Sequence, residues 1–467
     1  MSVPAPPLDL ARPRRLHVVG VGGPGMSAIA LALAQMGHRV SGSDLRERPV
    51  LDRLRAAGVA VSVGHHRSHV QGCDAVTAST AVPADLNELD EARRLGIPVL
   101  TRAGMLASIC AQARSLGVAG THGKTTTSSM LMLMLAEAGL RPSFVIGGDV
   151  TDMGTGAQWT GGEWFVVEAD ESDGTHLELP LHGTIVTNVE TDHLDHYGSF
   201  ECIVASFDQY LRNVGGPKVV CGDDPIGARL AAEHGATTYG TSEGVDVRAV
   251  DVRATHGTLT FAIEQAGAHL VDISLPQRGM HNVRNATAAL AMAFAIGVAP
   301  AVAAAALAKF GGVARRFDIR GVDRGATFVD DYAHLPSEIT AVLDAARRSD
   351  DGWRRVVAVF QPNRYNRIAE MWADYGDSFG DADVVVLTEI YSSGTQPIPG
   401  VTGRLIVNAV LDHAPFTRVA WLPKRDDLVT FLAGEVRDGD VCISMGCGDI
   451  ATLPDEVLAA RRGSPVR

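Results

Sequence analysis

The chain has no excess of positive charge and no paired cysteines. Its 41 Lys and Arg residues stand against 54 Asp and Glu residues, a formal net charge of −13. This balance disfavours binding to the phosphate backbone of nucleic acids and to anionic membranes. The six cysteines are scattered and form no Cys-x-x-Cys pair, so they indicate neither a zinc site nor a disulfide framework. We therefore expect a cytoplasmic protein without nucleic-acid or membrane partners.

A long hydrophobic run is also missing. No apolar h-region follows the basic residues near the N-terminus, so we expect no signal peptide. The most membrane-like stretch, residues 286–308, is mostly alanine and is interrupted by Gly297 and Pro300. Buried helices of a globular domain explain this stretch better than a membrane span does.

Short β-branched runs alternate with alanine- and leucine-rich segments along the chain, a pattern typical of an α/β fold with mostly parallel sheets. We expect strands at residues 16–19, 39–41, 75–79, 98–100, 115–119, 164–168, 184–187, 218–221, 355–360, 383–387 and 440–444. Residues 247–273 instead predict antiparallel hairpins, with turns at Gly257 and Gly267. We divide the chain into three expected domains, residues 1–112, 113–317 and 318–467, and expect a disordered basic tail at 461–467.

A glycine-containing loop precedes a helical pattern in the second expected domain. Residues 117–127 read Gly-Val-Ala-Gly-Thr-His-Gly-Lys-Thr-Thr-Thr. Gly120 and Gly123 let backbone N–H groups turn toward a ligand, and the helix N-terminus adds a positive dipole end. Lys124 supplies a point charge for phosphate, and Thr125 a hydroxyl suited to Mg²⁺. The loop therefore predicts nucleotide binding rather than a plain helix cap.

An earlier loop, Gly20-x-Gly22-x-x-Gly25, also follows an expected strand and opens a helix, and Asp44 ends the next strand. By these local criteria it is a dinucleotide fingerprint, so an NAD-dependent dehydrogenase is one interpretation. The diphosphate of a nucleotide sugar would bind the same loop for the same physical reasons. The second loop favours two separate phosphate ligands, which a dehydrogenase does not need.

Acidic residues follow two strands of the block that carries the second loop. They are Glu168, Asp170, Glu171 and Asp173 after one strand, and Glu190, Asp192 and Asp195, with His193, after the other. Ligands gather at the carboxyl ends of parallel strands, and Mg²⁺ prefers oxygen ligands together with substrate phosphates. The pattern therefore predicts a magnesium site beside the phosphate loop.

Polar pairs mark the rest of the chain. Asn282 and Asn285 lie three residues apart before an alanine-rich helix, where they could read an adenine edge or Asn282 could cap the helix. Arg316, next to Arg315, either reaches a γ-phosphate or belongs to a solvated basic hinge.

Two further arginines, Arg364 and Arg367, follow the strand at 355–360. Their spacing places them on one helical face, where they could clamp a carboxylate or pair with surface charges. Their position after a strand end favours the functional interpretation.

Together these segments resemble the Mur ligases of peptidoglycan synthesis, from about residue 15 to about residue 453. The matching segments are Val21-Gly-Gly-Pro-Gly-Met-Ser27, Gly120-Thr-His-Gly-Lys-Thr-Thr126, Glu168-Ala-Asp-Glu-Ser-Asp173, Thr187-Asn-Val-Glu-Thr-Asp-His-Leu-Asp195, His281-Asn-Val-Arg-Asn285, Arg315-Arg-Phe317, Asp330-Asp-Tyr-Ala-His334 and Met445-Gly-Cys-Gly-Asp449. The first loop is most similar to that of the branch that adds L-alanine.

The resemblance implies a Rossmann-like N-terminal domain, a central P-loop ATPase-like domain with a mostly parallel sheet, and a Rossmann-like C-terminal domain. It implies ATP and Mg²⁺ as cofactors and UDP-N-acetylmuramate and L-alanine as substrates of a monomer or homodimer. ATP would phosphorylate the lactyl carboxylate, and the amine of L-alanine would attack the acyl phosphate. A ligase of the same family with another amino acid or peptide substrate remains an alternative.

The resemblance also assigns roles. Catalysis would fall to Lys124, His193, Arg316 and His334, and the metal to Thr125, Glu168 and His193. ATP would contact Gly120, Thr121, His122, Gly123, Lys124, Thr125, Thr126, His281, Asn282, Asn285, Arg316 and Asp331. The other substrates would contact Gly22, Gly23, Gly25, Met26, Ser27, Asp44, Ser79, Arg102, Asn188, Tyr332, His334, Arg364 and Arg367.

Three positions of the third block depart from the family pattern. Leu335 and Asn363 stand where the family usually has histidine, and Thr395 where it often has glutamate. All three fall in the block expected to hold the amino acid. We expect L-alanine to remain the substrate because Arg364, Arg367 and His334 persist.

Overall fold

The computed structural model describes residues 7–79 and 81–463. Its contacts divide the chain into two compact units. The first comprises the described residues up to Val250, with Ala262–Ile273 and Arg284–Gly311; the second comprises Asp251–Phe261, Ser274–Val283 and the described residues from Gly312 onward. Within the described residues, no helix is both long and apolar enough to cross a membrane.

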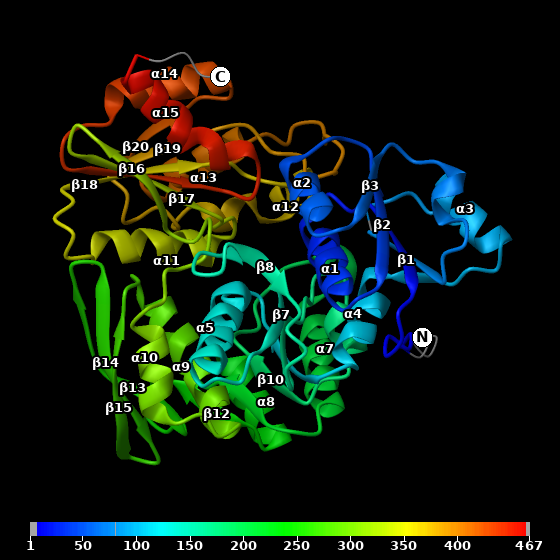
Figure 1. The fold of residues 1–467 in the computed structure, drawn as a ribbon. Helices are drawn as coiled ribbons and strands as arrows, with labels where there is room; N and C mark the ends of the chain where they lie inside the picture. The colour runs from blue at the N-terminus through cyan, green and yellow to red at the C-terminus, as the bar shows by residue number, and fades with distance from the viewer. Residues whose placement is uncertain (1–6, 80, 464–467) are drawn as a thin grey trace. The chain divides into compact units, whose positions relative to one another are not determined.

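The N-terminal sheet has five parallel strands in the order β3-β2-β1-β4-β5 (Figure 1). Its elements are β1 (Arg15–Val19), α1 (Pro24–Gln35), β2 (Arg39–Asp44), α2 (Pro49–Ala56), β3 (Ala60–Val63), the 3-10 helix η1 (Arg67–Val70), β4 (Ala75–Ala78), α3 (Asn87–Arg94), β5 (Val99–Thr101) and α4 (Arg102–Cys110). The strand order reverses beside β1, so the loop after β1 lies at the switch point where open α/β sheets bind ligands.

The second sheet has ten strands in the order β15-β14-β13-β12-β11-β10-β6-β9-β7-β8. The strands from β13 to β7 in this order are parallel to their neighbours, and β8 is antiparallel to β7. The elements are β6 (Arg114–Ala119), α5 (Lys124–Glu137), β7 (Ser143–Val150), β8 (Thr155–Gln158), β9 (Trp164–Glu168), η2 (Thr175–Glu178), β10 (Gly183–Val186), α6 (Leu194–Tyr197), α7 (Phe200–Asn213), β11 (Lys218–Cys221), α8 (Pro225–His234), β12 (Thr237–Gly240), β13 (Val247–Thr255), β14 (Thr258–Gln265), β15 (Ala268–Leu275), α9 (Met280–Ala295) and α10 (Pro300–Leu307).

The strands β13, β14 and β15 are joined by the two-residue turns His256-Gly257 and Ala266-Gly267, and they run side by side in Figure 1. Connections this short join only antiparallel strands. All four turn residues have positive φ, as the type I′ turns of hairpins require. The predicted hairpins are confirmed. The alanine-rich run forms two separate helices, α9 and α10.

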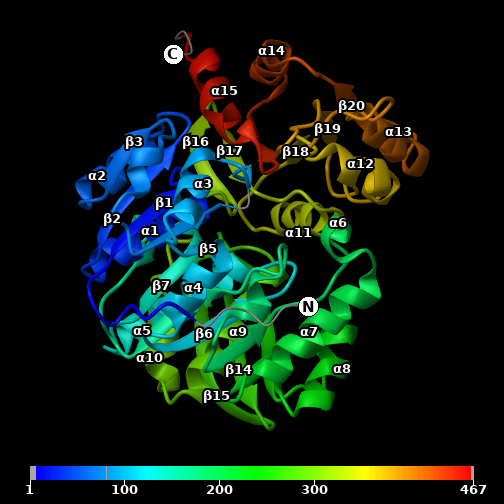
Figure 2. The same cartoon turned by 90° about the vertical axis from the view of Figure 1, so that its right-hand side faces the viewer.

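The C-terminal sheet has six strands in the order β16-β17-β21-β18-β19-β20, all parallel except the antiparallel pair β16 and β17 (Figure 2). Its elements are β16 (Asp318–Asp323), β17 (Ala326–Asp331), α11 (Pro336–Arg347), β18 (Arg355–Phe360), α12 (Tyr365–Met371), η3 (Trp372–Tyr375), β19 (Val384–Leu387), α13 (Arg404–His413), β20 (Arg418–Trp421), α14 (Arg425–Glu435), β21 (Asp440–Met445), η4 (Asp449–Thr452) and α15 (Leu453–Arg461).

The predicted fold class, α/β with mostly parallel sheets, is confirmed. The residue bounds of the three expected domains stay predictions. The expected disordered tail is wrong at Arg461, which ends α15, is buried and donates from Nε to Asp323 at 2.7 Å. Residues 464–467 of that tail lie outside the described part of the chain.

Candidate active site

The loop between β6 and α5 is shaped by two glycines with positive φ, Gly120 at +127° and Gly123 at +80°. A Cβ on Gly120 would clash with the hydroxyl of Thr187, directly after β10, and a Cβ on Gly123 would clash with the amide of Asn285. Both positions therefore need glycine for two reasons, the backbone conformation and the close approach of a neighbour. The loop places the N-terminus of α5 at the carboxyl end of the sheet, as predicted.

Lys124 is the first residue of α5, and its side chain folds back over the loop. Its Nζ donates to the carbonyl of Gly120 at 2.6 Å, to that of Thr121 at 3.2 Å and to the Glu171 carboxylate at 2.9 Å. Burial alone would lower the pKa of Lys124, but the charges of Glu171 and Asp170 outweigh burial and raise it. The ammonium is therefore a positive charge held against the phosphate loop. The sequence pattern identified Glu171 only as a member of an acidic run and did not predict that it pairs with Lys124.

Glu168, at the end of β9, has the properties of a metal ligand. Its carboxyl is buried, and burial raises its pKa although Thr125 and the backbone of Gly147 hydrogen-bond to it. Within the described residues, its Oε1 has no hydrogen-bond partner. A buried oxygen of this kind next to a hydroxyl fits a divalent cation such as Mg²⁺.

His193 precedes α6 with a positive φ of 55°, and its Nε2 lies 3.1 Å from Asp192 Oδ2. The contacts described for His193 and Glu168 do not join the two side chains. A shared ion therefore stays a prediction for His193.

The residues after β10 hold the phosphate loop. Asn188 accepts from the backbone N–H of His122 at 2.8 Å and donates to the His122 carbonyl at 3.3 Å. The hydroxyl of Thr121 accepts from the backbone N–H of Glu190 at 2.9 Å. Thr126, in the first turn of α5, is buried. Asn188 therefore supports the loop backbone, and its predicted substrate contact is untested.

Helix α9 begins at Met280, so Asn282 and Asn285 both lie inside it, three residues apart. The alternative that Asn282 caps the helix is wrong, because its amide donates from inside the first turn to the carbonyl of Arg278 at 2.8 Å. The side chain of Asn285 lies against Gly123, which brings this predicted adenine contact to the phosphate loop. The ring of His281 lies over Gly279.

The first glycine loop is held by the end of β2. Asp44 accepts from the backbone N–H of Gly22 at 2.8 Å, and a Cβ on Gly22 would lie 2.7 Å from the same carboxylate oxygen. Ser27 donates from Oγ to the carbonyl of Pro24 at 2.9 Å. The side chain of Met26 is buried in the core, so only its backbone is available to a ligand.

Three further predicted positions lie within or beside this loop. Ser79 Cβ would lie 3.2 Å from a Cβ on Gly20, and Gly23 is the N-cap of α1. Arg102 lies beside Gly25 and donates from Nη2 to Asp170 at 3.0 Å and to Asp173 at 2.9 Å. Arg102 thus links the first predicted block to the acidic run of the second, which its sequence position alone did not indicate.

In the C-terminal unit, two guanidinium groups lie over the ring of Tyr332. The Cζ atoms of Arg315 and Arg316 lie 5.0 and 5.2 Å from its centroid. Arg315 pairs with the buried Asp330 at 3.0 Å, whereas Arg316 lies 3.9 Å from Glu338. The alternative of a solvated hinge is therefore wrong for Arg315, which is tied into the fold.

Asp331 is buried and accepts from the backbone N–H groups of Phe317 and Ala333, both at 2.7 Å. Burial raises its pKa to about 6. His334 places Nδ1 3.1 Å from Glu338 Oε2, and its ring meets that of Tyr332 edge-on. Asp331 therefore shapes the turn that presents Tyr332 and His334, and its predicted ATP contact is untested.

Arg364 lies outside helix α12, as its N-cap residue, with a φ of +61°. The premise that Arg364 and Arg367 share one helical face is therefore wrong. Arg367 is buried, and its Nη1 donates to the Asn363 amide oxygen at 2.9 Å. A carboxylate clamp by this pair stays a prediction that helical spacing no longer supports.

The three residues that depart from the family pattern each take part in local contacts. Asn363 accepts from Arg367, and Thr395 Oγ1 accepts from the backbone N–H of Tyr365 at 3.0 Å. Leu335 is buried directly before α11. Each replacement has a packing or hydrogen-bonding role of its own.

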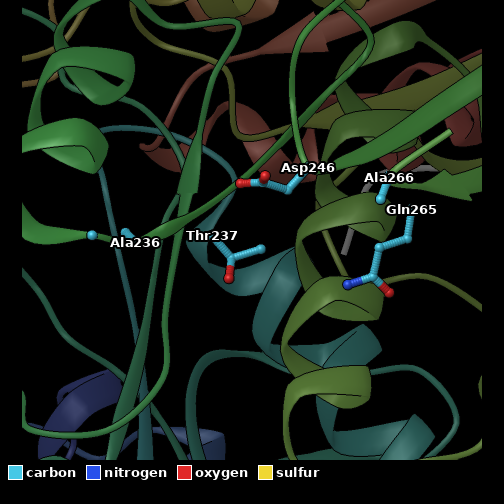
Figure 3. Close-up of a pocket in the computed structure, with 6 residues that line it drawn as sticks. Ala236, Thr237, Asp246, Gln265 and Ala266 are labelled. Atoms are coloured by element: carbon cyan, nitrogen blue, oxygen red, sulfur yellow. The ribbon is translucent and has the colours of Figure 1, made fainter.

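A pocket of about 330 Å³ lies away from these residues (Figure 3). It is lined by Gly235, Ala236, Thr237, Asp246, Gln265 and Ala266. Asp246 points across it, but its Oδ2 already accepts from the backbone N–H of Thr238 at 2.7 Å. None of the predicted site residues lines this pocket.

Comparison with known proteins identifies the family of the chain. Three family models match the chain: the Mur ligase family catalytic domain over residues 15–114, the Mur ligase middle domain over 118–293, and the Mur ligase glutamate ligase domain over 315–448. The chain belongs to the Mur ligase family of ATP-dependent ligases.

Particular members of the family are similar over nearly the whole chain. The UDP-N-acetylmuramate–L-alanine ligase of Acidothermus cellulolyticus is 46% identical over 464 residues, covering 98% of this chain and 97% of the relative. That of Pelobacter propionicus is 43% identical, covering 93% and 95%. The crystal structure of UDP-N-acetylmuramate–alanine ligase from Thermotoga maritima superposes with a TM-score of 0.82 at 28% identity, covering 97% of this chain and 100% of that one.

Proposed function

We propose that the protein joins L-alanine to the lactyl carboxylate of UDP-N-acetylmuramate in an ATP-dependent step of peptidoglycan precursor synthesis. Two relatives that are UDP-N-acetylmuramate–L-alanine ligases are 46% and 43% identical over nearly the full chain. The observation that carries the proposal for the site itself is the first turn of α5. There the ammonium of Lys124 folds over the loop, and the hydroxyl of Thr125 contacts Glu168, whose Oε1 has no partner within the described residues.

The proposed chemistry follows from the poor electrophilicity of a carboxylate. Phosphorylation of the lactyl carboxylate gives an acyl phosphate with a good leaving group, and the amine of L-alanine attacks the acyl carbon. The amine loses a proton, and phosphate departs. Such a reaction depends on positioning and on neutralising phosphate charge.

Lys124 supplies the charge for the transferred phosphoryl group in this proposal. Thr125, Glu168 and His193 would hold Mg²⁺, which would shield the phosphate oxygens. Arg316 approaches the same phosphoryl group, and Asn282 and Asn285 contact adenine. The loop from Gly22 to Ser27 binds the diphosphate of the sugar nucleotide at the N-terminus of α1.

Tyr332, His334, Arg364 and Arg367 are proposed to frame the amino acid. Cytoplasmic location, a monomeric or dimeric state and the absence of other partners belong to the same proposal. The dehydrogenase alternative assigns the first loop to NAD instead. Nicotinamide fluorescence titration separates the two, and we expect no binding.

The deciding experiment incubates the purified protein with ATP, Mg²⁺, UDP-N-acetylmuramate and single amino acids and measures phosphate release. We expect release with L-alanine, and less with glycine or L-serine. Release with another amino acid alone would replace L-alanine as the substrate. An absence of release with every amino acid would reject the ligase assignment.

A further inference from the structure

Three histidines surround one buried glutamate beside the N-terminal sheet. His17 comes from β1, His65 follows β3, His69 lies in η1 and Glu88 lies in α3. The side chains of Glu88 and His17 are 0% and 1% exposed, and that of His65 is 8% exposed. Four separate elements therefore deliver imidazole and carboxylate groups to one interior point.

Both carboxylate oxygens of Glu88 are engaged by this group. Oε1 lies 2.6 Å from His69 Nδ1 and 3.6 Å from His17 Nε2. Oε2 lies 2.8 Å from His65 Nδ1 and accepts from the hydroxyl of Ser43 at 2.8 Å. Glu88 is thus a fully buried carboxyl group with polar contacts at both oxygens.

A buried anion needs a counter-charge, because leaving water costs several kcal/mol per ion. The contacts described for Glu88 reach the three imidazoles, Ser43 and the backbone N–H of His66 at 3.3 Å, and they include no Lys or Arg. The counter-charge must therefore come from a proton on an imidazole or from a bound cation.

The orientation of His17 favours a bound cation. Its Nδ1 lies 2.8 Å from Ser41 Oγ, and the Ser41 hydroxyl donates to the Leu16 carbonyl at 3.4 Å. With its own hydrogen directed to that carbonyl, Ser41 accepts from Nδ1, so the Nε2 lone pair faces Glu88. Metal-ligating histidines are commonly held by such a bond through the other ring nitrogen. Likewise, His65 and Ser43 fix Oε2 and leave Oε1 directed to His17 and His69.

We propose that His17 Nε2, His69 Nδ1 and Glu88 Oε1 bind Zn²⁺ or a similar divalent transition metal. These three atoms lie within 4.8 Å of one another, and a tetrahedral zinc site spaces its ligands by about 3.3 Å. The spacing of His17 and Glu88 already suits this geometry. His69 must move outward by about 0.7 Å to reach the same spacing, and its side chain, 23% exposed on a short 3-10 helix, has room to do so.

The proposed ion differs from the magnesium of the phosphate loop in chemistry and in place. Two imidazoles and one carboxylate suit zinc, whereas Mg²⁺ prefers oxygen ligands alone. Ser43, which holds Glu88, directly precedes Asp44, which holds the first glycine loop. The ion would tie η1 and α3 to β1 and β2 under that loop. Its proposed role is structural and independent of the ligase reaction.

Cobalt titration of chelator-treated, full-length protein tests the site, because Co²⁺ in tetrahedral sites absorbs strongly in the visible. We expect one Co²⁺ per chain with a tetrahedral spectrum, displaced by Zn²⁺ and not by Mg²⁺. His69→Gln and Glu88→Gln should weaken binding by about 10²-fold or more. His66→Gln is the matched control, because its exposed ring pairs with Ser68 rather than with Glu88.

A second control separates this site from another histidine–carboxylate group, formed by Asp208, Glu233 and His234. His234→Gln should leave the spectrum unchanged. Should Glu88→Gln fail to fold, the partly exposed His69→Gln decides, together with X-ray absorption of the zinc-loaded wild type, where imidazole scattering is expected. Failure of the wild type to bind Co²⁺, or unchanged binding by His69→Gln, would overturn the proposal and leave a proton as the counter-charge of Glu88.

Discussion

At the residue scale, the phosphate loop is organised around a single ammonium group. Replacing Lys124 by Ala should lower phosphate release by about 10²-fold or more, because a charge directed at the transferred phosphoryl group is lost. Binding of UDP-N-acetylmuramate, proposed for another loop, should remain. Phosphate release and calorimetric binding measure the two effects. Lys309→Ala is the matched control, since Lys309 is exposed and pairs with Glu137 at 2.7 Å. Loss of activity in the control, or full activity in Lys124→Ala, would contradict the role of Lys124.

A second residue-scale prediction concerns His176 in η2. This side chain is 1% exposed, packs against Phe207 and Tyr210, and has no hydrogen-bond partner for either ring nitrogen within the described residues. Burial lowers its pKa from 6.5 to about 4. The folded state therefore resists protonation that the unfolded state accepts. The contribution of neutral His176 to the free energy of unfolding is fully present above pH 6.5. It is lost as the pH falls toward 4, by up to about 3 kcal/mol.

Replacing His176 by Phe keeps the aromatic packing and removes the titrating group. We expect the variant to gain stability over the wild type at pH 5 and little at pH 8, as measured by urea unfolding at both values. His269→Phe, at a position 56% exposed, should show no such pH-dependent gain. If the stability difference between His176→Phe and the wild type were the same at both pH values, protonation of His176 would not be the cause of the low-pH loss.

At the scale of elements, helix α5 carries glycines with positive φ at both ends. Gly123 precedes it, where a Cβ would clash with Asn285, and Gly139 follows it, with no atom within 4 Å of a Cβ. Replacement by Ala should cost about 1–2 kcal/mol at either position, because both force a left-handed backbone on a residue with a Cβ. Only Gly123→Ala should also displace Asn285 and reduce ATP-dependent phosphate release. Equal ATP-dependent activities of the two variants would contradict the assignment of Asn285 and Gly123 to the ATP site.

Elements defined by local patterns were predictable from sequence, and those defined by packing were not. The hairpin turns at Gly257 and Gly267 were found because two-residue turns need glycine. Strands β7 and β8 were missed, because Gly147, Gly148 and Gly156 interrupt the β-branched pattern. Within the site, the role of Lys124 was predictable because its position relative to Gly120 and Gly123 is visible in the sequence of one loop.

Contacts between distant segments are the part that spacing does not reveal. Arg102 meets Asp170 and Asp173, about 70 residues away. The tract from His65 to His69 is visible as histidine-rich, but its meeting with Glu88 depends on how α3 packs. The face shared by Arg364 and Arg367 was predicted wrongly, since the positive φ of Arg364 has no signature in sequence.

At the scale of the whole molecule, the two compact units have cores of their own. The cluster around Leu33, Phe165 and Phe207 belongs to the first unit, and the cluster around Phe360 and Tyr375 to the second. Compact units with separate cores can unfold as separate cooperative steps. We therefore expect two transitions in scanning calorimetry.

UDP-N-acetylmuramate should move only one of these transitions, because the loop from Gly22 to Ser27 belongs wholly to the first unit. At about 100 times its dissociation constant, a ligand stabilises the folded state that binds it by about 2.7 kcal/mol. His176→Phe at pH 5 should raise the same transition, since His176 lies in that unit too. The sugar nucleotide could instead raise the midpoint of the other transition, the one that His176→Phe does not change. Its binding site would then lie in the second unit. A single transition moved by both changes would show that the two cores unfold together.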